Sequence, residues 1–133
     1  MARIINDIDN TNFPFSEETY EIFGICMEVH RILGKGFAEI VYKDALEYEF
    51  KMRGINYERE KEYSVSYKNI ILPHRFYADF VVLGSIILEV KSTPSIGSEA
   101  MAQVLNYLAI SKCKVGLIAN FGELSFKSKR LIL

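Results

Sequence analysis

The sequence predicts a mixed α/β domain in which a central sheet is flanked by helices. Two early segments, residues 16–33 and about 38–53, place apolar side chains at helical spacing. The pattern then changes to alternating or continuously apolar runs, which are typical of strands. One more helical segment divides these strands into a group of three and a group of two. We therefore expect the order ααβββαββ, a meander of strands followed by a helical crossover.

The helical segments are marked by their apolar faces and by the residues at which they stop. The first ends at the GKG stretch of Gly34 to Gly36 and the second at Gly54, because glycine adopts the backbone conformation that terminates helices. The third follows the loop TPSIGSEA and should run from about 98 to 111. Its apolar face contains Met101, Val104, Leu105 and Leu108.

The strands differ in how much of their surface they should bury. Residues 57–67 alternate and carry many charges, as a strand with one wet face would, whereas 114–120 is of the buried type. The stretch IILPHRFYADFVVLGSIILEVKS should form two strands that meet at Gly84, with an interruption of the first at Pro73. The last strand lies in LSFKSKRLIL, and NFGE (120–123) should precede it as a tight turn.

The length of 133 residues suits a single domain, which we place at 16–133 after an N-terminal arm of 1–15. The net charge of −1 argues against a strongly basic nucleic-acid binder. No segment reaches the roughly 18 consecutive apolar residues of a membrane helix, and the N-terminus does not resemble a signal peptide. Cys26 and Cys113 fit no metal-ligand spacing, so we expect two reduced thiols in a cytoplasmic protein that does not contact a membrane.

Two charges interrupt the apolar run FVVLGSIILEVK. Glu89 and Lys91 point to the same face of a strand because successive side chains alternate. The preceding strand carries one acid, Asp79, and Gly84 lies midway between the two acids. A three-residue loop centred on Gly84 would place Asp79 directly opposite Glu89, whereas a two-residue loop would shift the register by one. The length of the turn therefore decides whether the two acids meet.

Two opposed carboxylates repel each other unless they share a proton or bind a divalent cation. Oxygen ligands suit Mg²⁺ or Mn²⁺, and the carbonyl of Val90 would lie beside such an ion. Lys91 could then orient a water molecule or offset charge on a phosphate. The alternative is that Lys91 only forms salt bridges with Asp79 or Glu89 at a wet sheet edge.

Residues on the helices are candidates for the same site. Glu39 shares a helical face with Tyr42, although it is also a first-turn acid of the kind that the helix dipole favours. His30 lies beside the apolar stripe of its helix, either as a core residue or as a group that contacts an acid or the substrate. Gln103 and Tyr107 share a face, either as a core-edge polar pair or as donors to a phosphate or a base edge.

Several stretches, in order along the chain, resemble one known family. GFAEIVY (36–42) matches the signature GxxExxY, and EVHRILGKG (28–36) is similar to the segment that precedes it. YADFVVLGSIILEVKS (77–92) resembles an Asp…Glu-x-Lys hairpin, while AQVLNYL (102–108) and VGLIANFG (115–122) resemble the last helix and the strand after it. The chain thus resembles the GxxExxY family, which is placed in the PD-(D/E)xK nuclease-like superfamily.

The resemblance implies a restriction-endonuclease-like core with a central mixed five-stranded sheet flanked by helices. It also implies that Asp79 and Glu89 bind Mg²⁺ and that Lys91 assists the attacking water. Glu39 resembles the extra acid that some branches supply from their first helices. Gln103 and Tyr107 resemble the Gln-xxx-Tyr element of exonuclease-like branches, which lies near the substrate strand.

Two functions are open at this point. The first is a nuclease that uses Mg²⁺ or Mn²⁺ to hydrolyse DNA or RNA. The second is a non-catalytic module that binds nucleic acid or serves as a subunit of a complex. The near-neutral charge favours the second, because phosphate contacts usually need several Lys or Arg, and a homodimer or a larger complex would supply the missing surface. Glycosidases also use paired carboxylates, but the adjacent lysine and the absence of Trp disfavour that chemistry.

Overall fold

The computed structural model describes residues 3–5 and 14–133, and this part of the chain forms three helices and a six-stranded sheet. The helices are α1 (Ser16–Leu33), α2 (Glu39–Arg53) and α3 (Ser98–Ser111). The strands are β1 (Arg3–Ile5), β2 (Tyr57–Tyr67), β3 (Ile70–Val82), β4 (Ile86–Lys91), β5 (Val115–Asn120) and β6 (Lys127–Ile132). The strands follow the order β1-β6-β5-β4-β3-β2 across the sheet.

From α1 to β6 the elements follow the predicted order ααβββαββ. β4 and β5 are parallel and are joined by α3, while the other neighbouring strands are antiparallel. The five strands from β2 to β6 therefore form the mixed sheet expected of a restriction-endonuclease-like core. β1 adds a sixth strand at the edge of this sheet.

The described part of the N-terminal arm is a strand rather than a free segment, because Arg3–Ile5 pairs with β6. The rest of the expected arm up to residue 13, at 1–2 and 6–13, lies outside the described residues. The join between β5 and β6 is longer than the expected tight turn, since residues 121–126 separate the two strands.

β3 is continuous, so the expected interruption at Pro73 was wrong. Opposite this proline the pairing of β2 shifts register between Ser64 and Ser66. Such a bulge leaves backbone groups without regular ladder partners, so the missing amide of Pro73 breaks no regular pairing there.

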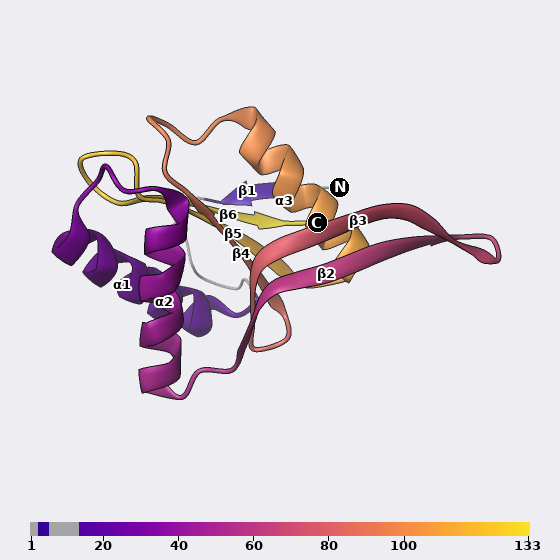
Figure 1. Ribbon diagram of the computed structural model, residues 1–133, viewed down its shortest axis with the longest axis horizontal. Helices are drawn as coiled ribbons and strands as arrows, with labels where there is room; N and C mark the ends of the chain where they lie inside the picture. Colours follow the sequence, from indigo (N-terminus) through magenta and orange to yellow (C-terminus); the bar gives the residue numbers. More distant parts are fainter. Residues whose placement is uncertain (1–2, 6–13) are drawn as a thin grey trace.

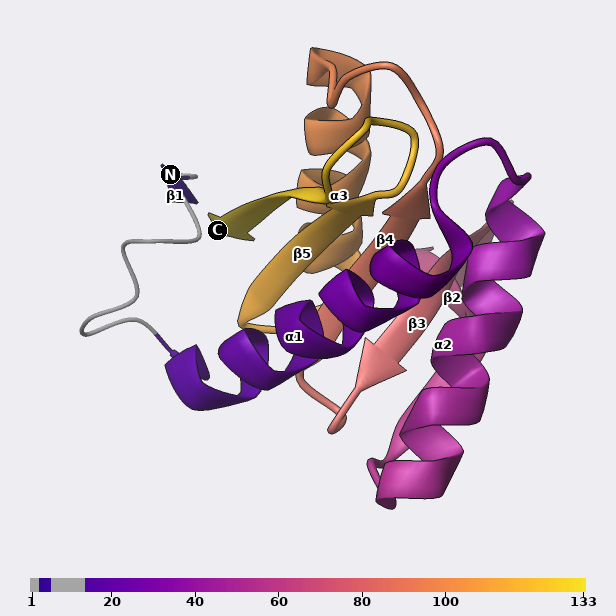
Figure 2. The same ribbon diagram turned by 90° about the vertical axis from the view of Figure 1, so that its left-hand side faces the viewer.

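The two faces of the sheet are covered by different helices. Figures 1 and 2 show α1 and α2 over one face and α3 over the other. The core beneath α1 and α2 contains Phe50 together with Leu88 and Val90 of β4, whereas Leu108 of α3 packs on Ile87. Alternate residues of β4 thus belong to opposite layers, as the alternation of strand side chains requires.

The close approach of α3 to the sheet depends on Gly116 in β5. A β-carbon at this position would lie 2.3 Å from Cγ1 of Val104 and 3.3 Å from Cδ1 of Leu108. The absent side chain lets α3 pack directly on the strand. This helix carries Gln103 and Tyr107, so Gly116 sets how near these two residues come to the sheet.

Two further expectations concern the membrane and the thiols. Among the described residues, no helix combines the length and apolar character needed to cross a membrane. Cys26 is buried and Cys113 is half-buried, and both are free thiols.

We expect Gly116→Ala to destabilise the fold by about 1–3 kcal/mol, because the new methyl group overpacks the contact with the stiff, β-branched Val104. Gly24→Ala is the matched control, since Gly24 lies exposed on α1 with nothing within 4 Å of an added β-carbon. That change should stabilise the protein by about 0.5–1 kcal/mol through helix propensity. Urea unfolding measures both, and changes of the same sign would contradict the close packing of α3.

Candidate active site

β3 and β4 form a hairpin whose turn is the three-residue loop 83–85. Leu83 and Gly84 have left-handed backbone conformations, with φ of 56° and 70°, which suit a tight reversal. The paired residues are Phe80 with Leu88, Val81 with Ile87, and Val82 with Ile86. Continuing this register places Asp79 opposite Glu89, so the predicted hairpin register is confirmed.

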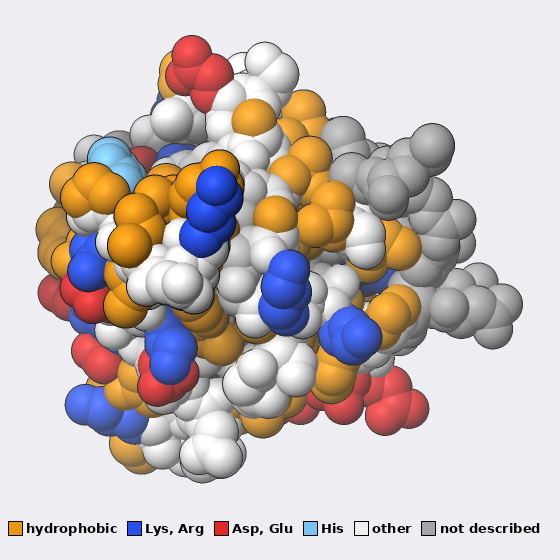
Figure 3. Space-filling view, turned by 90° about the vertical axis from the view of Figure 1, so that its right-hand side faces the viewer, with side chains coloured by type: hydrophobic (Ala, Val, Ile, Leu, Met, Phe, Trp, Pro, Cys, Tyr) orange, Lys and Arg blue, Asp and Glu red, His pale blue; other side chains and the backbone are white. Residues whose placement is uncertain are grey.

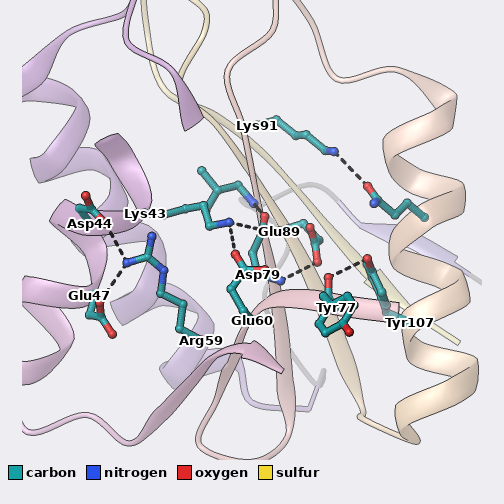
Figure 4. A network of polar contacts seen from close by, with 12 residues as sticks. Lys43, Asp44, Glu47, Arg59, Glu60, Tyr77, Asp79, Glu89, Lys91 and Tyr107 are labelled. Carbon is teal, nitrogen blue, oxygen red and sulfur yellow. Dashed lines mark hydrogen bonds and ion pairs between the residues drawn. The ribbon is translucent and has the colours of Figure 1, made fainter. Parts of the chain in front are cut away.

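The two acids lie where the backbone pairing between β3 and β4 ends. The amide of Asp79 donates a hydrogen bond of 3.0 Å to Oε1 of Glu89, and the amide of Val90 donates one of 2.8 Å to Oδ2 of Asp79 (Figure 4). Side-chain oxygens thus take the place of the next carbonyl acceptors in the ladder. We call Asp79 and Glu89 the carboxylate fork, because they fill the space in which the strands part.

Glu89 holds a proton at neutral pH in the metal-free protein. Its side chain is buried, with a residue exposure of 2%. Burial, and after it the charge of Asp79, raises the pKa of Glu89 to about 9, and the opposing effects of the Asp79 amide and the Lys91 charge are smaller. Two carboxylates in contact do not both ionise readily, so the fork carries a single negative charge at neutral pH.

Lys43 of α2 supplies a positive charge to the fork. Its ammonium donates a hydrogen bond of 3.0 Å to Oδ1 of Asp79 and also contacts the carboxylate of Glu60 on β2 (Figure 4). Burial alone would lower the pKa of Lys43, but its hydrogen bonds to Glu60 and Asp79 outweigh that effect and raise the pKa. A protonated ammonium therefore balances the charge on Asp79.

Glu60 occupies an unusual backbone conformation beside the fork. The pairing of β2 with β3 joins Arg59 to Phe80 and Lys61 to Ala78, so Glu60 lies opposite Asp79. Its φ is 54°, a left-handed value that non-glycine residues seldom adopt, least of all within a strand. Residues held in such conformations tend to occur at functional sites, and here the result is a third carboxylate that shares Lys43 with Asp79.

The sequence analysis missed both Lys43 and Glu60. Lys43 follows Glu39 by one helical turn, so the two share a face of α2, and this spacing was the available signal. Glu60 lies in the run EREKE (58–62), where all five residues are charged and acids alternate with bases. Nothing in that run distinguishes Glu60 from its neighbours, because the deciding feature is its backbone conformation.

Lys91 points along the face of β4 that carries Glu89, toward α3. Its ammonium donates a hydrogen bond of 2.9 Å to Oε1 of Gln103 (Figure 4). Within residues 14–133 it forms no ion pair with Asp79 or Glu89, which was the alternative interpretation. The lysine is thus held by a neutral acceptor rather than by an acid.

α3 also brings Tyr107 to the neighbourhood of the fork. The Tyr107 hydroxyl donates a hydrogen bond of 2.8 Å to the carbonyl oxygen of Tyr77 (Figure 4). Burial, and after it the charge of Glu89, raises the pKa of Tyr107, so this hydroxyl remains protonated. Beside Lys91 and Gln103, a cavity of about 530 Å³ opens between residues 92–97 and α3.

Glu39 and His30 make no contact with Asp79 or Glu89 among the hydrogen bonds of the described residues. Glu39 is the first residue of α2, is half-buried, and forms no hydrogen bond with either acid in the described part of the chain. Nε2 of His30 lies 2.9 Å from the carbonyl oxygen of Glu123, and the ring stacks on Phe121 with a centroid separation of 6.2 Å. Through these contacts His30 fastens α1 to the loop after β5.

Asn120, at the end of β5, holds the segment that follows β4. Its Oδ1 accepts hydrogen bonds from the amides of Thr93 (3.0 Å) and Gly122 (3.1 Å), and its Nδ2 donates to the Thr93 carbonyl (3.0 Å). Ser92 donates a hydrogen bond of 2.8 Å to the carbonyl of Phe37, just before α2. The end of β4 is thereby tied to both β5 and α2, which holds Lys91 in place.

The donor set of the fork fits a small divalent ion. In the residues that the structure describes, no three His, Cys, Asp or Glu side chains are grouped to hold a metal. Asp79, Glu89 and the Val90 carbonyl are instead oxygen donors of the kind that hard divalent cations prefer. The ammonium of Lys43 on Asp79 shows that this carboxylate can be reached by a cation.

Comparison with known proteins agrees with this geometry. Residues 16–131 match the family model of the PD-(D/E)XK nuclease superfamily. The chain belongs to this superfamily. Nucleases of the PD-(D/E)XK superfamily generally use divalent metals and act on nucleic acid. The Asp79, Glu89 and Lys91 positions carry the residue types that give the superfamily its name.

Two other comparisons add little. No curated protein matches the chain. A solved structure described as "Crystal structure of SSO0001" resembles 86% of this PD-(D/E)XK chain, with 19% sequence identity and a TM-score of 0.49. The chain spans 58% of the length of that protein.

The protonated Glu89 makes the stability of the metal-free protein depend on pH. Because folding raises the pKa of Glu89 from 4.5 to about 9, its contribution is fully present below pH 4.5 and is lost as the pH rises toward 9. The free energy of unfolding should fall by at most about 1.4 kcal/mol per pH unit from this group. Glu89→Gln should remove that slope. Urea unfolding of both proteins in EDTA between pH 4.5 and 9 tests this prediction. An equal dependence of the free energy of unfolding on pH in wild type and Glu89→Gln would contradict the raised pKa.

We expect Lys43→Met to destabilise the metal-free protein by about 2 kcal/mol, less than for a fully buried pair because Glu60 is partly exposed. Adding Mg²⁺ should reduce the difference in stability between Lys43→Met and the wild type, because a divalent ion can replace the lost ammonium beside Asp79. Lys61→Met is the matched control, because the ion pair of Lys61 with Glu58 is exposed to solvent and its loss should be near neutral. Thermal unfolding with and without Mg²⁺ measures both effects. Equal losses at the two lysines would count against the role of Lys43.

Proposed function

We propose that this protein is a metal-dependent nuclease of the GxxExxY branch, which hydrolyses phosphodiester bonds of DNA or RNA with Mg²⁺ or Mn²⁺. The observation that carries the proposal is the carboxylate fork, in which the opposed Asp79 and Glu89 are held by hydrogen bonds of 3.0 and 2.8 Å from the backbone amides of Asp79 and Val90. Lys91 follows on the same face of β4 and is not paired with either acid. In a chain of the nuclease superfamily, two acids and a free lysine at parting strand ends suit phosphodiester hydrolysis.

Asp79, Glu89 and the Val90 carbonyl would hold the metal ion. A bound divalent ion polarises a phosphate oxygen and lowers the pKa of water. Glu89 must first lose the proton that its raised pKa retains, so binding should release a proton and become tighter as the pH rises. Lys43 keeps Asp79 oriented through its 3.0 Å hydrogen bond until the ion binds.

Lys91 would orient the attacking water or stabilise the charge that develops on the phosphate. The Lys91 ammonium lies 2.9 Å from Oε1 of Gln103, which holds the ammonium in place without neutralising its charge. A phosphate oxygen could therefore replace the Gln103 amide oxygen as the acceptor. Tyr107 and Gln103 would contact the substrate strand from α3. Glu39, one turn before Lys43 on α2, would supply an additional acid at the rim of the site.

A second candidate function is a non-catalytic module that binds nucleic acid or joins a complex. The observation that favours it is that both acids already accept hydrogen bonds from backbone amides where the β3–β4 ladder ends. In this case the acids would serve the fold, and a second copy of the chain or another protein would supply the surface for a partner.

Cleavage assays test the first function. The wild-type protein should cut a nucleic acid substrate with Mg²⁺ or Mn²⁺ and should be inactive in EDTA. Lys91→Ala should lower the cleavage rate by at least about a hundredfold, because it removes a group that acts in the transition state. Lys51→Ala, on the exposed last turn of α2, is the control and should leave the rate unchanged.

Calorimetry separates the two functions. The nuclease should bind Mn²⁺, and Asp79→Asn should abolish that binding while the protein stays folded. If no Mn²⁺ binds, no substrate is cut, and Asp79→Asn binds nucleic acid as the wild type does, the non-catalytic function is the correct one.

A further inference from the structure

The hairpin of β2 and β3 extends beyond the rest of the sheet. β3 pairs with β4 only at residues 80–82, so the earlier part of β3 is paired with β2 alone. Figure 1 shows this two-stranded ribbon projecting away from α1 and α2. We call residues 63–76 the distal ribbon.

Acidic residues are absent from the distal ribbon. No Asp or Glu lies between Glu62 and Asp79, although the whole chain has 17 acids and a net charge of −1. The same stretch contains Lys68, His74 and Arg75, together with Ser, Tyr and Asn side chains. The outer end of the hairpin is therefore positive in a protein that is otherwise slightly negative.

The basic side chains of the distal ribbon are not committed to acids. In the described part of the chain Lys68 and Arg75 form no ion pair; Lys68 lies over the ring of Tyr67 at 5.5 Å, and Arg75 donates a hydrogen bond of 2.7 Å to the Leu72 carbonyl. Arg59, near the base of the hairpin, is by contrast paired with two acids. Basic side chains that form no ion pair can bind phosphates without first breaking an ion pair with an acid.

A groove of about 410 Å³ separates the distal ribbon from the outer half of α3. Its lining includes the hydroxyls of Ser64 and Ser66, the amide of Asn106 and the ammonium of Lys112. The register shift between the two serines marks a bulge, which bends a ribbon. Figure 3 shows the face toward which the ribbon points, with Lys and Arg side chains across its middle and the acidic ones nearer its margins.

We propose that the distal ribbon enters the major groove of double-stranded DNA, with Lys68 and Arg75 on its phosphates and Lys112 on the backbone across the groove. This rests on the proposed nuclease function and names its substrate as B-form duplex DNA. The charge of the acid-free ribbon is complementary to the phosphates, whose neutralisation dominates affinity for DNA.

The shape of the ribbon selects the duplex. The major groove of B-form DNA admits a two-stranded ribbon, whereas the major groove of A-form RNA is deep and narrow. The exposed Tyr67 and Ile70 near its tip suit apolar contact with thymine methyl groups. Arg75 precedes Asp79 by four residues on β3, which is about 13 Å along the strand. DNA bound by the ribbon is thus led toward the carboxylate fork.

Binding measurements in EDTA, where the DNA stays intact, test the proposal. Lys68→Glu, Arg75→Glu and Lys112→Glu should each weaken binding of a short DNA duplex by about tenfold and lower its salt dependence by about one phosphate contact. Lys51→Glu makes the same change in net charge on α2 and should bind as the wild type does. Wild-type protein should prefer duplex DNA to duplex RNA and to single-stranded DNA of the same length.

Two results would overturn the proposal. One is equal weakening by Lys51→Glu and Arg75→Glu, or equal affinity for the three nucleic acids, because either would make binding independent of the ribbon. The other is that the ribbon joins two copies of this chain. In that case sedimentation would find a wild-type dimer that Ile71→Asp splits, and Arg75→Glu would leave DNA binding unchanged.

A small substrate separates this proposal from the proposed function. Bis(p-nitrophenyl) phosphate is too small to reach from the fork to the ribbon, so Arg75→Glu should hydrolyse it with Mn²⁺ at the wild-type rate while losing cleavage of duplex DNA. If wild type hydrolyses neither substrate but shows the expected binding pattern, the nuclease function fails and the ribbon surface stands. Unchanged duplex cleavage by Arg75→Glu would refute the ribbon surface alone.

Discussion

The site is organised by the repulsion between the buried carboxylate of Glu89 and the half-buried carboxylate of Asp79, which the β3–β4 hairpin forces together. Asp79 and Glu89 face each other because the turn centred on Gly84 sets the register. In a poorly solvated position they cannot both be charged without compensation. The metal-free protein meets this constraint with a proton on Glu89 and with the ammonium of Lys43 on Asp79. A single divalent ion bound to the two acids could replace both the proton on Glu89 and the ammonium of Lys43.

The surrounding elements converge on this fork from both faces of the sheet. α2 contributes Lys43, and α3 contributes Gln103, which positions Lys91. Both helices reach the place where the backbone pairing between β3 and β4 ends. Gly116 allows α3 to lie close enough for its polar side chains to take part.

Much of this could be predicted from local patterns. Apolar spacing located the helices, and a three-residue loop centred on Gly84 predicted that Asp79 lies opposite Glu89. The partner of Lys91 was harder to foresee, because a lysine beside two acids would ordinarily pair with one of them, and here α3 offers Gln103 instead. Glu60 could not be recognised from its alternating surroundings, since its left-handed backbone arises only when β2 pairs with β3. The role of β1 was hidden because three residues are too few to show a strand pattern.

The hydrogen bonds of the fork have a consequence for how such chains diverge. The carboxylates of Glu89 and Asp79 are acceptors for the backbone amides of Asp79 and Val90, so both acids help to close the sheet where its ladder ends. A descendant that had lost all enzymatic use would still be under selection to keep oxygen acceptors at these positions. Within the described residues, the Lys91 ammonium donates its hydrogen bond to a side chain on α3 and to no backbone group. The lysine, rather than the more conspicuous pair of acids, is thus the position whose retention would distinguish a working lineage from a decayed one.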